Sequence, residues 1–128
     1  MKSTFIITIL IAVTGIVIFN FLSKSGGNGD MSDWKQQIEN EPGVVIDVRT
    51  DDEYNQGHLA VADHQFDLMN GDFENNLDDL DKNKTYYLYC RTGNRSGKAA
   101  DMMKKQGFEK VHNIGGFEDL ANSGFDTE

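Results

Sequence analysis

The chain has 128 residues, a length typical of a single domain of moderate size. All 21 acidic residues lie from Asp30 onward, where ten of the 12 basic residues accompany them. This acidic balance disfavours nucleic acid as a partner, because clusters of lysine and arginine bind the phosphate backbone. The single cysteine excludes an intramolecular disulfide and leaves one thiol for chemistry.

Residues 1–24 predict a membrane anchor. They carry no charge from Ser3 to Ser23, and the run from Phe5 to Leu22 is almost wholly apolar. As a helix this run would extend about 27 Å, close to the ~30 Å hydrocarbon core of a bilayer. The alternative is a cleaved signal peptide, which would release a secreted domain, but its apolar region usually has only about 7 to 15 residues.

The anchor would leave the rest of the chain outside the cytoplasm. Lys2 precedes the apolar run and only Lys24 closely follows it, a bias that keeps the N-terminus cytoplasmic. Residues 25–31 have the glycine-rich composition of a flexible tether. We therefore expect the domain formed by residues 32–128 to lie on the periplasmic or extracytoplasmic side, close to the membrane.

Residues 32–128 alternate between helical and extended patterns. The first predicted helix is capped by Ser32. Further helices are predicted over residues 51–56 (capped by Thr50 or Asp51), 73–80, 96–106 and 117–122, and strands over residues 44–48, 85–89 and 110–114. Such an alternation predicts an α/β domain with a mainly parallel sheet and helices on both faces.

The lone cysteine, Cys90, follows the predicted strand 85–89 and precedes the helix 96–106. Ligands bind at this edge of an open parallel sheet, and a helix N-terminus there directs backbone N–H groups toward an anion. The loop between them contains Arg91, Thr92, Gly93, Asn94, Arg95 and Ser96. We expect its backbone N–H groups and its two guanidinium groups to lower the pKa of Cys90 and make the thiolate a nucleophile. The alternative is that Cys90 is a small buried core residue.

Two further motifs accompany this loop. The first is Asp47-Val48-Arg49, followed at short spacing by Glu53-Tyr54 and Gly57-His58-Leu59, and the second is Val111-His112-Asn113-Ile114-Gly115-Gly116. Together with the Cys90 loop, they resemble the rhodanese family. The segment from Val44 to Leu120 is similar to single-domain rhodaneses of the phage-shock protein E group. It departs from the family at Val61–Phe66, where Gly-Ala and a strand ending in Pro are usual.

The resemblance implies a rhodanese-like fold with about five strands and a sulfurtransferase activity. Cys90 would carry sulfur as a persulfide, and residues 91–96 would bind the substrate. The structural interpretation of the first motif is that Asp47 and Arg49 organise the sheet edge and that His58 packs or bonds to the backbone. The alternative for His58 is a direct catalytic role as a general acid or base. The partners would be a small anionic donor such as thiosulfate and an acceptor such as cyanide, a thiol or a protein. No cofactor or metal is implied.

Other interpretations of the Cys90 loop fit less well. A cysteine phosphatase or arsenate reductase needs five residues between cysteine and arginine, whereas four separate Cys90 from Arg95. A nucleotide-binding loop would need Ser or Thr where Ala99 stands, and the histidines lack the spacing of a known zinc site. A non-enzymatic persulfide carrier or redox sensor remains open, because it would use the same cysteine.

Overall fold

The computed structural model of the protein describes residues 31–128. The predicted membrane anchor and nearly all of the predicted tether lie outside these residues, so both remain predictions. Within residues 31–128 no helix has the length and apolar character needed to cross a membrane.

Four parallel strands form the sheet of the described domain, in the order β2-β1-β3-β4. Their bounds are Val44–Asp47 (β1), His64–Gln65 (β2), Thr85–Cys90 (β3) and Lys110–Gly116 (β4). The expectation of about five strands is therefore wrong for residues 31–128. The one further pairing is an isolated antiparallel bridge between Leu59 and Thr127. It does not extend into a strand, because the chain turns at Ala60–Val61 immediately afterwards.

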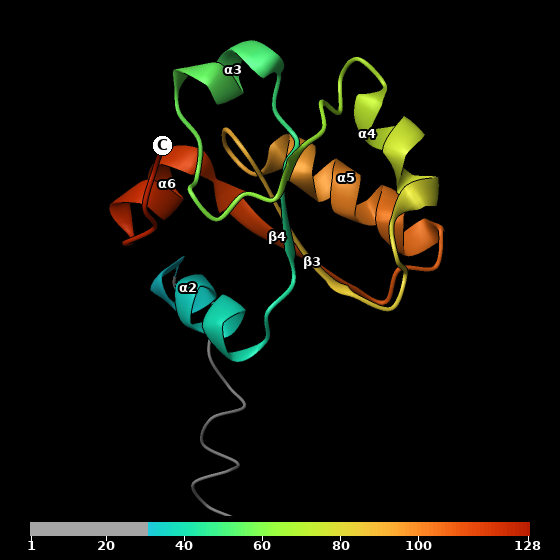
Figure 1. Cartoon of the computed structure of the whole chain (residues 1–128), viewed down its shortest axis with the longest axis horizontal. Coiled ribbons are helices and arrows are strands. Elements are labelled where there is room, and N and C mark those ends of the chain that lie inside the picture. The colour runs from blue at the N-terminus through green and yellow to red at the C-terminus, as the bar shows by residue number, and fades with distance from the viewer. Residues whose placement is uncertain (1–30) are drawn as a thin grey trace, which may run out of the picture. The chain divides into compact units, whose positions relative to one another are not determined.

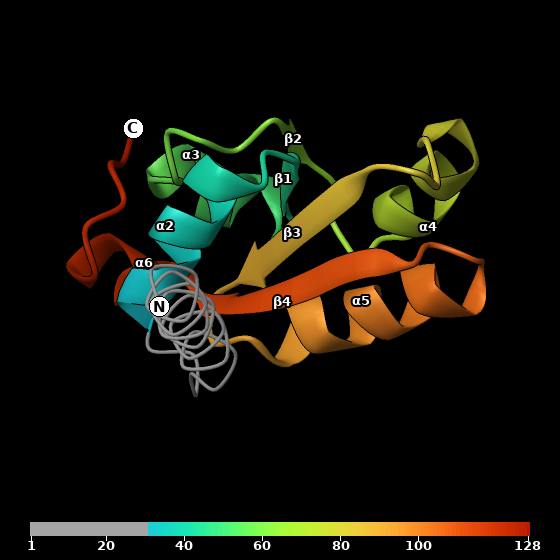
Figure 2. The same cartoon turned by 90° about the horizontal axis from the view of Figure 1, so that it is seen from below.

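Helices cover both faces of the sheet, as the alternating pattern predicted (Figures 1 and 2). Their bounds are Met31–Asn40 (α2), Asp51–Gln56 (α3), Asp72–Asn76 (α4), the 3₁₀ turn Leu77–Asp79 (η1), Asn94–Lys105 (α5) and Phe117–Asn122 (α6). The buried residues form two clusters, one with side chains from α4, η1 and α5 and the other with side chains from α6 and partly buried ones from α2. Each cluster lies between the sheet and its helices.

The central strand β3 supplies both clusters through the alternation of its side chains. Tyr86, Leu88 and Cys90 join the cluster beneath α5, whereas Tyr87 and Tyr89 join the cluster beneath α6. All six residues of β3 are buried, which fits a parallel strand covered on both faces. Because β3 ends with Cys90, the core fixes the position at which the loop leaves the sheet.

The end of β4 holds that loop in place from the neighbouring strand. A register shift opposite Leu88 and Tyr89 brings Gly115 beside Tyr89 and Gly116 beside Cys90. A Cβ atom on Gly116 would lie 2.5 Å from the carbonyl oxygen of Arg91, so only glycine allows this approach. The paired glycines of the second motif thus let β4 pass directly beneath the Cys90 loop.

Candidate active site

The Cys90 side chain is buried at the start of a tight loop that becomes helix α5. Gly93 has a φ of 96°, a left-handed conformation that favours glycine. The Gly93 N–H donates to Cys90 Sγ, with 3.0 Å between nitrogen and sulfur. Ser96 Oγ lies 3.4 Å from the same sulfur. Cys90 is therefore buried as a core residue would be, yet its sulfur contacts polar hydrogen-bonding groups.

These contacts change the acidity of the thiol. Burial raises the pKa of Cys90, but hydrogen bonds from the Ser96 side chain and from the backbone N–H groups of Ser96, Thr92 and Gly93 outweigh it and lower the pKa below its ordinary value. The direction agrees with the prediction from the sequence. Its main cause is the hydrogen bonding of the loop rather than the charge of the neighbouring arginines, and the thiolate is stabilised where a helix begins.

Asn113 in β4 connects the loop to the sheet, a role that no pattern in the sequence indicated. Its Oδ1 accepts hydrogen bonds from Ser96 Oγ at 2.7 Å and Gly115 N at 3.1 Å, and its Nδ2 donates to the Gly93 carbonyl at 2.9 Å. Ser96 has one hydroxyl proton, which can point to Asn113 or to Cys90 but not to both. When the thiol ionises, rotation of that proton toward Sγ would give the thiolate an additional donor.

We expect Ser96→Ala to raise the pKa of Cys90. A hydrogen bond to a charged group contributes about 1.5–3 kcal/mol, so its loss should slow alkylation by iodoacetamide at neutral pH roughly tenfold. The rate should be measured across a pH series. Thr92→Ala is the matched control, because it removes an exposed side chain and keeps the backbone N–H. An unchanged alkylation profile in Ser96→Ala would mean that the backbone alone sets the acidity of the thiol.

The two loop arginines lie in different environments. Arg95 Nη1 and Nη2 bind Glu53 Oε1 and Oε2 of α3 at 2.7 and 2.9 Å, a bidentate ion pair across 42 positions of sequence. Hydrogen bonds from Arg95 lower the pKa of Glu53 to about 2, so the carboxylate stays ionised. Arg91 is exposed. The sequence motif contained Glu53, but no local pattern indicated its partner.

Asp47 and Arg49 form a buried ion pair at the end of β1, with side chains 0% and 5% exposed. Arg49 Nη2 lies 2.7 Å from Asp47 Oδ2 and donates to the Gly57 carbonyl at 2.8 Å. The guanidinium also lies over the Phe117 ring, 4.5 Å from its centre. Arg49 thus joins β1 to the end of α3 and to α6, which is the supporting position expected from the sequence.

The side chain of His58 is fixed by contacts with Tyr54. Its ring stacks on Tyr54 with 3.7 Å between ring centres, and Nδ1 lies 3.1 Å from the Tyr54 carbonyl oxygen. The prediction that His58 packs and bonds to the backbone is confirmed.

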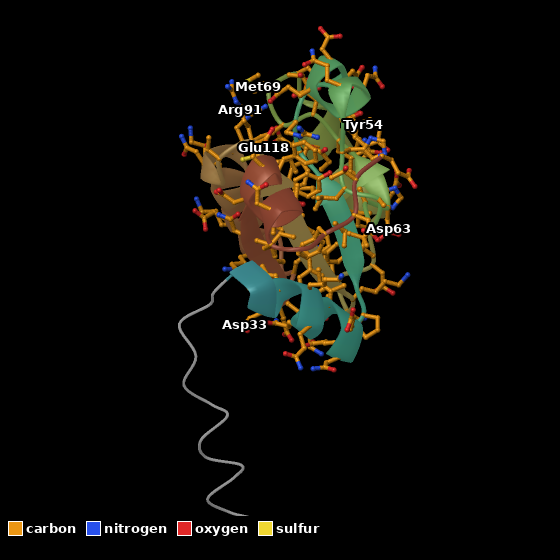
Figure 3. The ribbon with its side chains drawn as sticks, turned by 90° about the vertical axis from the view of Figure 1, so that its left-hand side faces the viewer. Asp33, Tyr54, Asp63, Met69, Arg91 and Glu118 are labelled. Carbon is orange, nitrogen blue, oxygen red and sulfur yellow. The ribbon has the colours of Figure 1, made fainter. Side chains whose placement is uncertain are left out.

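A cavity of about 420 Å³ lies beside the Cys90 loop. Its lining includes Arg91 from the loop, Glu53 from α3, and Phe117 and Glu118 from α6, together with Arg49, Gln56 and Gly57. Figure 3 shows Arg91 and Glu118 at the same end of the domain, opposite Asp33 of α2. This end holds the carboxyl ends of β1 and β3, where an open parallel sheet binds ligands.

Several known proteins are similar to this domain. A family model described as rhodanese-like domain matches residues 30–123. YrkF of Bacillus subtilis, named a putative sulfur carrier protein, is 31% identical over 111 residues, and the match covers 78% of this chain but 58% of YrkF. PspE of Escherichia coli, named a thiosulfate sulfurtransferase, is 32% identical over 78 residues, which cover 59% of this chain and 72% of PspE.

A solved structure described as a rhodanese with anions from Escherichia coli is also similar to this chain. It is 29% identical, has a TM-score of 0.58, and is matched over 66% of this chain and 95% of that chain. The family match takes in the whole sheet and the loop that follows Cys90. With the fold, the sequence match and a solved relative in agreement, this chain is a member of the rhodanese-like domain family.

Proposed function

We propose that the protein is a sulfurtransferase that moves a sulfane sulfur from thiosulfate or a similar donor, through a persulfide on Cys90, to cyanide or a thiol. The observation that carries this proposal is the position of Cys90 Sγ at a strand-to-helix loop, within 3.0 Å of a backbone N–H and with a lowered thiol pKa. The relative PspE, named a thiosulfate sulfurtransferase, supports the reaction class.

In the first step the Cys90 thiolate attacks the outer sulfur of thiosulfate. A bond forms between Sγ and that sulfur, the sulfur–sulfur bond of the donor breaks, and sulfite leaves with the bonding electron pair. The charge balances, because the thiolate and the thiosulfate dianion become the persulfide anion and the sulfite dianion. In the second step the acceptor attacks the terminal sulfur, so that cyanide leaves as thiocyanate and the Cys90 thiolate is regenerated.

The loop suits the anion formed between these steps. The negative charge of a persulfide lies one atom beyond Sγ, and the N-terminus of the 12-residue helix α5 follows directly. The N–H groups that lower the pKa of Cys90 would also stabilise this charge. No proton has to be delivered in either step with cyanide, so the lack of a general base next to Sγ is no obstacle.

The bidentate contact of Arg95 with Glu53 argues against a phosphatase. A cysteine phosphatase uses its loop arginine to bind two phosphate oxygens, and both terminal nitrogens of Arg95 already bind carboxylate oxygens. A persulfide carrier is the second candidate, because the relative YrkF is named a putative sulfur carrier protein. A carrier would accept one sulfur on Cys90 and release it only to a specific protein partner.

Initial rates separate these functions. The full chain is incubated with thiosulfate or methanethiosulfonate as donor, and with cyanide or dithiothreitol as acceptor. Many turnovers with small molecules are expected for the sulfurtransferase, whereas release of at most one sulfur per chain would indicate the carrier. Hydrolysis of a phosphate ester without any sulfur transfer would contradict both.

A further inference from the structure

The charges around the cavity beside the Cys90 loop cancel. Its lining contains Arg49, Arg91, Glu53 and Glu118, and the two ion pairs with lining residues add Asp47 and Arg95. Three positive and three negative side chains therefore surround the site. The whole chain has a formal net charge of −9, so the distant charges repel an approaching anion.

Glu53 neutralises Arg95, one of the two arginines of the loop. It binds both terminal nitrogens of Arg95, at 2.7 and 2.9 Å. A capping box fixes the position of Glu53. Its backbone N–H donates to Thr50 Oγ1, and its carboxylate accepts a hydrogen bond from the Thr50 backbone N–H. The low pKa of about 2 keeps the pair charged at every pH suited to an assay, and protonation of Glu53 would weaken it only as the pH falls toward that value.

A doubly charged donor is affected most by this neutralisation. The interaction of a donor with a local charge is proportional to the donor's own charge, so a dianion gains or loses twice the free energy of a monoanion at the same position. Thiosulfate carries two negative charges, and methanethiosulfonate carries one. The side chains around the site contribute no net positive charge, so only the backbone N–H groups of the loop remain to attract thiosulfate against the repulsion from the rest of the chain.

We infer, on the basis of the proposed function, that Glu53 is a specificity-determining residue: by occupying Arg95, it makes the site select sulfur donors with one negative charge or none over dianionic thiosulfate. The favoured class comprises thiosulfonates and persulfides of organic thiols. With methanethiosulfonate, the thiolate takes the outer sulfur and methanesulfinate leaves with the bonding pair, so the same Cys90 persulfide forms.

The test is Glu53→Gln, measured as kcat/KM with both donors and cyanide. Glutamine at this position preserves the capping box and removes the charge, so α3 is retained while Arg95 becomes available. We expect kcat/KM for thiosulfate to rise about tenfold and that for methanethiosulfonate about threefold. The logarithm of the rise in kcat/KM is proportional to the charge of the donor, which is twice as large for thiosulfate. For each donor, kcat/KM of the variant is divided by kcat/KM of the unmodified protein. The intrinsic reactivity of the donor cancels in this ratio, so the two ratios can be compared directly.

Asp52→Asn is the matched control. Asp52 is exposed on the same turn of α3, and its substitution removes the same charge at a residue that does not line the cavity. The change in donor preference should be less than about twofold, because an exposed charge is screened by salt and solvent. A fall in the thiosulfate rate of Glu53→Gln, equal changes for both donors, or an equal response in Asp52→Asn would overturn the inference.

A measurement on the unmodified protein tests the same inference without relying on a variant. If the local charges cancel, added salt should leave kcat/KM for thiosulfate unchanged or raise it, because salt screens the repulsion from the acidic surface. A several-fold fall with added salt would reveal an uncompensated cationic site and contradict the inference. The proposed function would fail separately, if the unmodified protein transferred sulfur from neither donor.

Discussion

Cys90→Ser should reduce sulfur transfer to the uncatalysed background with every donor. A serine hydroxyl is a poor nucleophile toward divalent sulfur unless a neighbouring general base removes its proton, and the groups that bond to Cys90 Sγ are backbone N–H groups and the Ser96 hydroxyl. Neither is a base. The measurement is the initial rate of thiocyanate formation from cyanide, with thiosulfate and with methanethiosulfonate.

The loss should come from chemistry and not from unfolding. Serine is close to cysteine in size, and the Gly93 N–H that donates to Sγ can donate to a hydroxyl oxygen instead. The variant should therefore keep the circular dichroism spectrum of the unmodified protein, and its free energy of unfolding should differ by no more than about 1 kcal/mol. Normal turnover in a folded Cys90→Ser protein would place the transferred sulfur on another residue or on none.

Asp47→Ala should destabilise the domain by about 3–5 kcal/mol, since it leaves the Arg49 guanidinium buried without its counter-ion. Arg49 also bonds to the Gly57 carbonyl, so its displacement should loosen the C-terminal end of α3. The free energy of unfolding from urea titration measures the effect.

Asp101→Ala is the control for Asp47→Ala. Asp101 is an exposed residue of α5, and its replacement should change the free energy of unfolding by no more than about 0.5 kcal/mol. A loss below 1 kcal/mol in Asp47→Ala would show that water solvates the Arg49 guanidinium when Asp47 is removed, and that the pair is not an essential part of the sheet edge.

The elements of the fold were predictable where the sequence alternates clearly between buried and exposed patterns. Strand β1 was predicted over residues 44–48 and lies at Val44–Asp47, and Thr50 caps α3 as one of the two predicted candidates. Helix α5 begins at Asn94, two residues before its predicted start, because Gly93 adopts a left-handed conformation and serves as its N-cap. Local sequence signals were sufficient for these elements.

Contacts between distant residues were not predictable in the same way. Strand β2 consists of only His64 and Gln65, which are not fully buried and lack the apolar run that marks a central strand. The Glu53–Arg95 pair and the Ser96–Asn113 bond join residues from different elements, and polar side chains at such positions do not reveal their partners. The sequence therefore indicated Cys90 and its loop, but not which group neutralises Arg95 or connects Ser96 to β4.

Isolation of the intermediate tests the central claim most directly. The full chain is incubated with methanethiosulfonate or thiosulfate, freed of excess donor, and analysed by mass spectrometry before and after addition of cyanide. A persulfide on Cys90 predicts that the intact protein gains the mass of one sulfur atom, that fragmentation assigns it to the peptide containing Cys90, and that cyanide removes it as thiocyanate. If the protein gains no sulfur from either donor, or if the added sulfur lies outside Cys90, the account of this site is wrong.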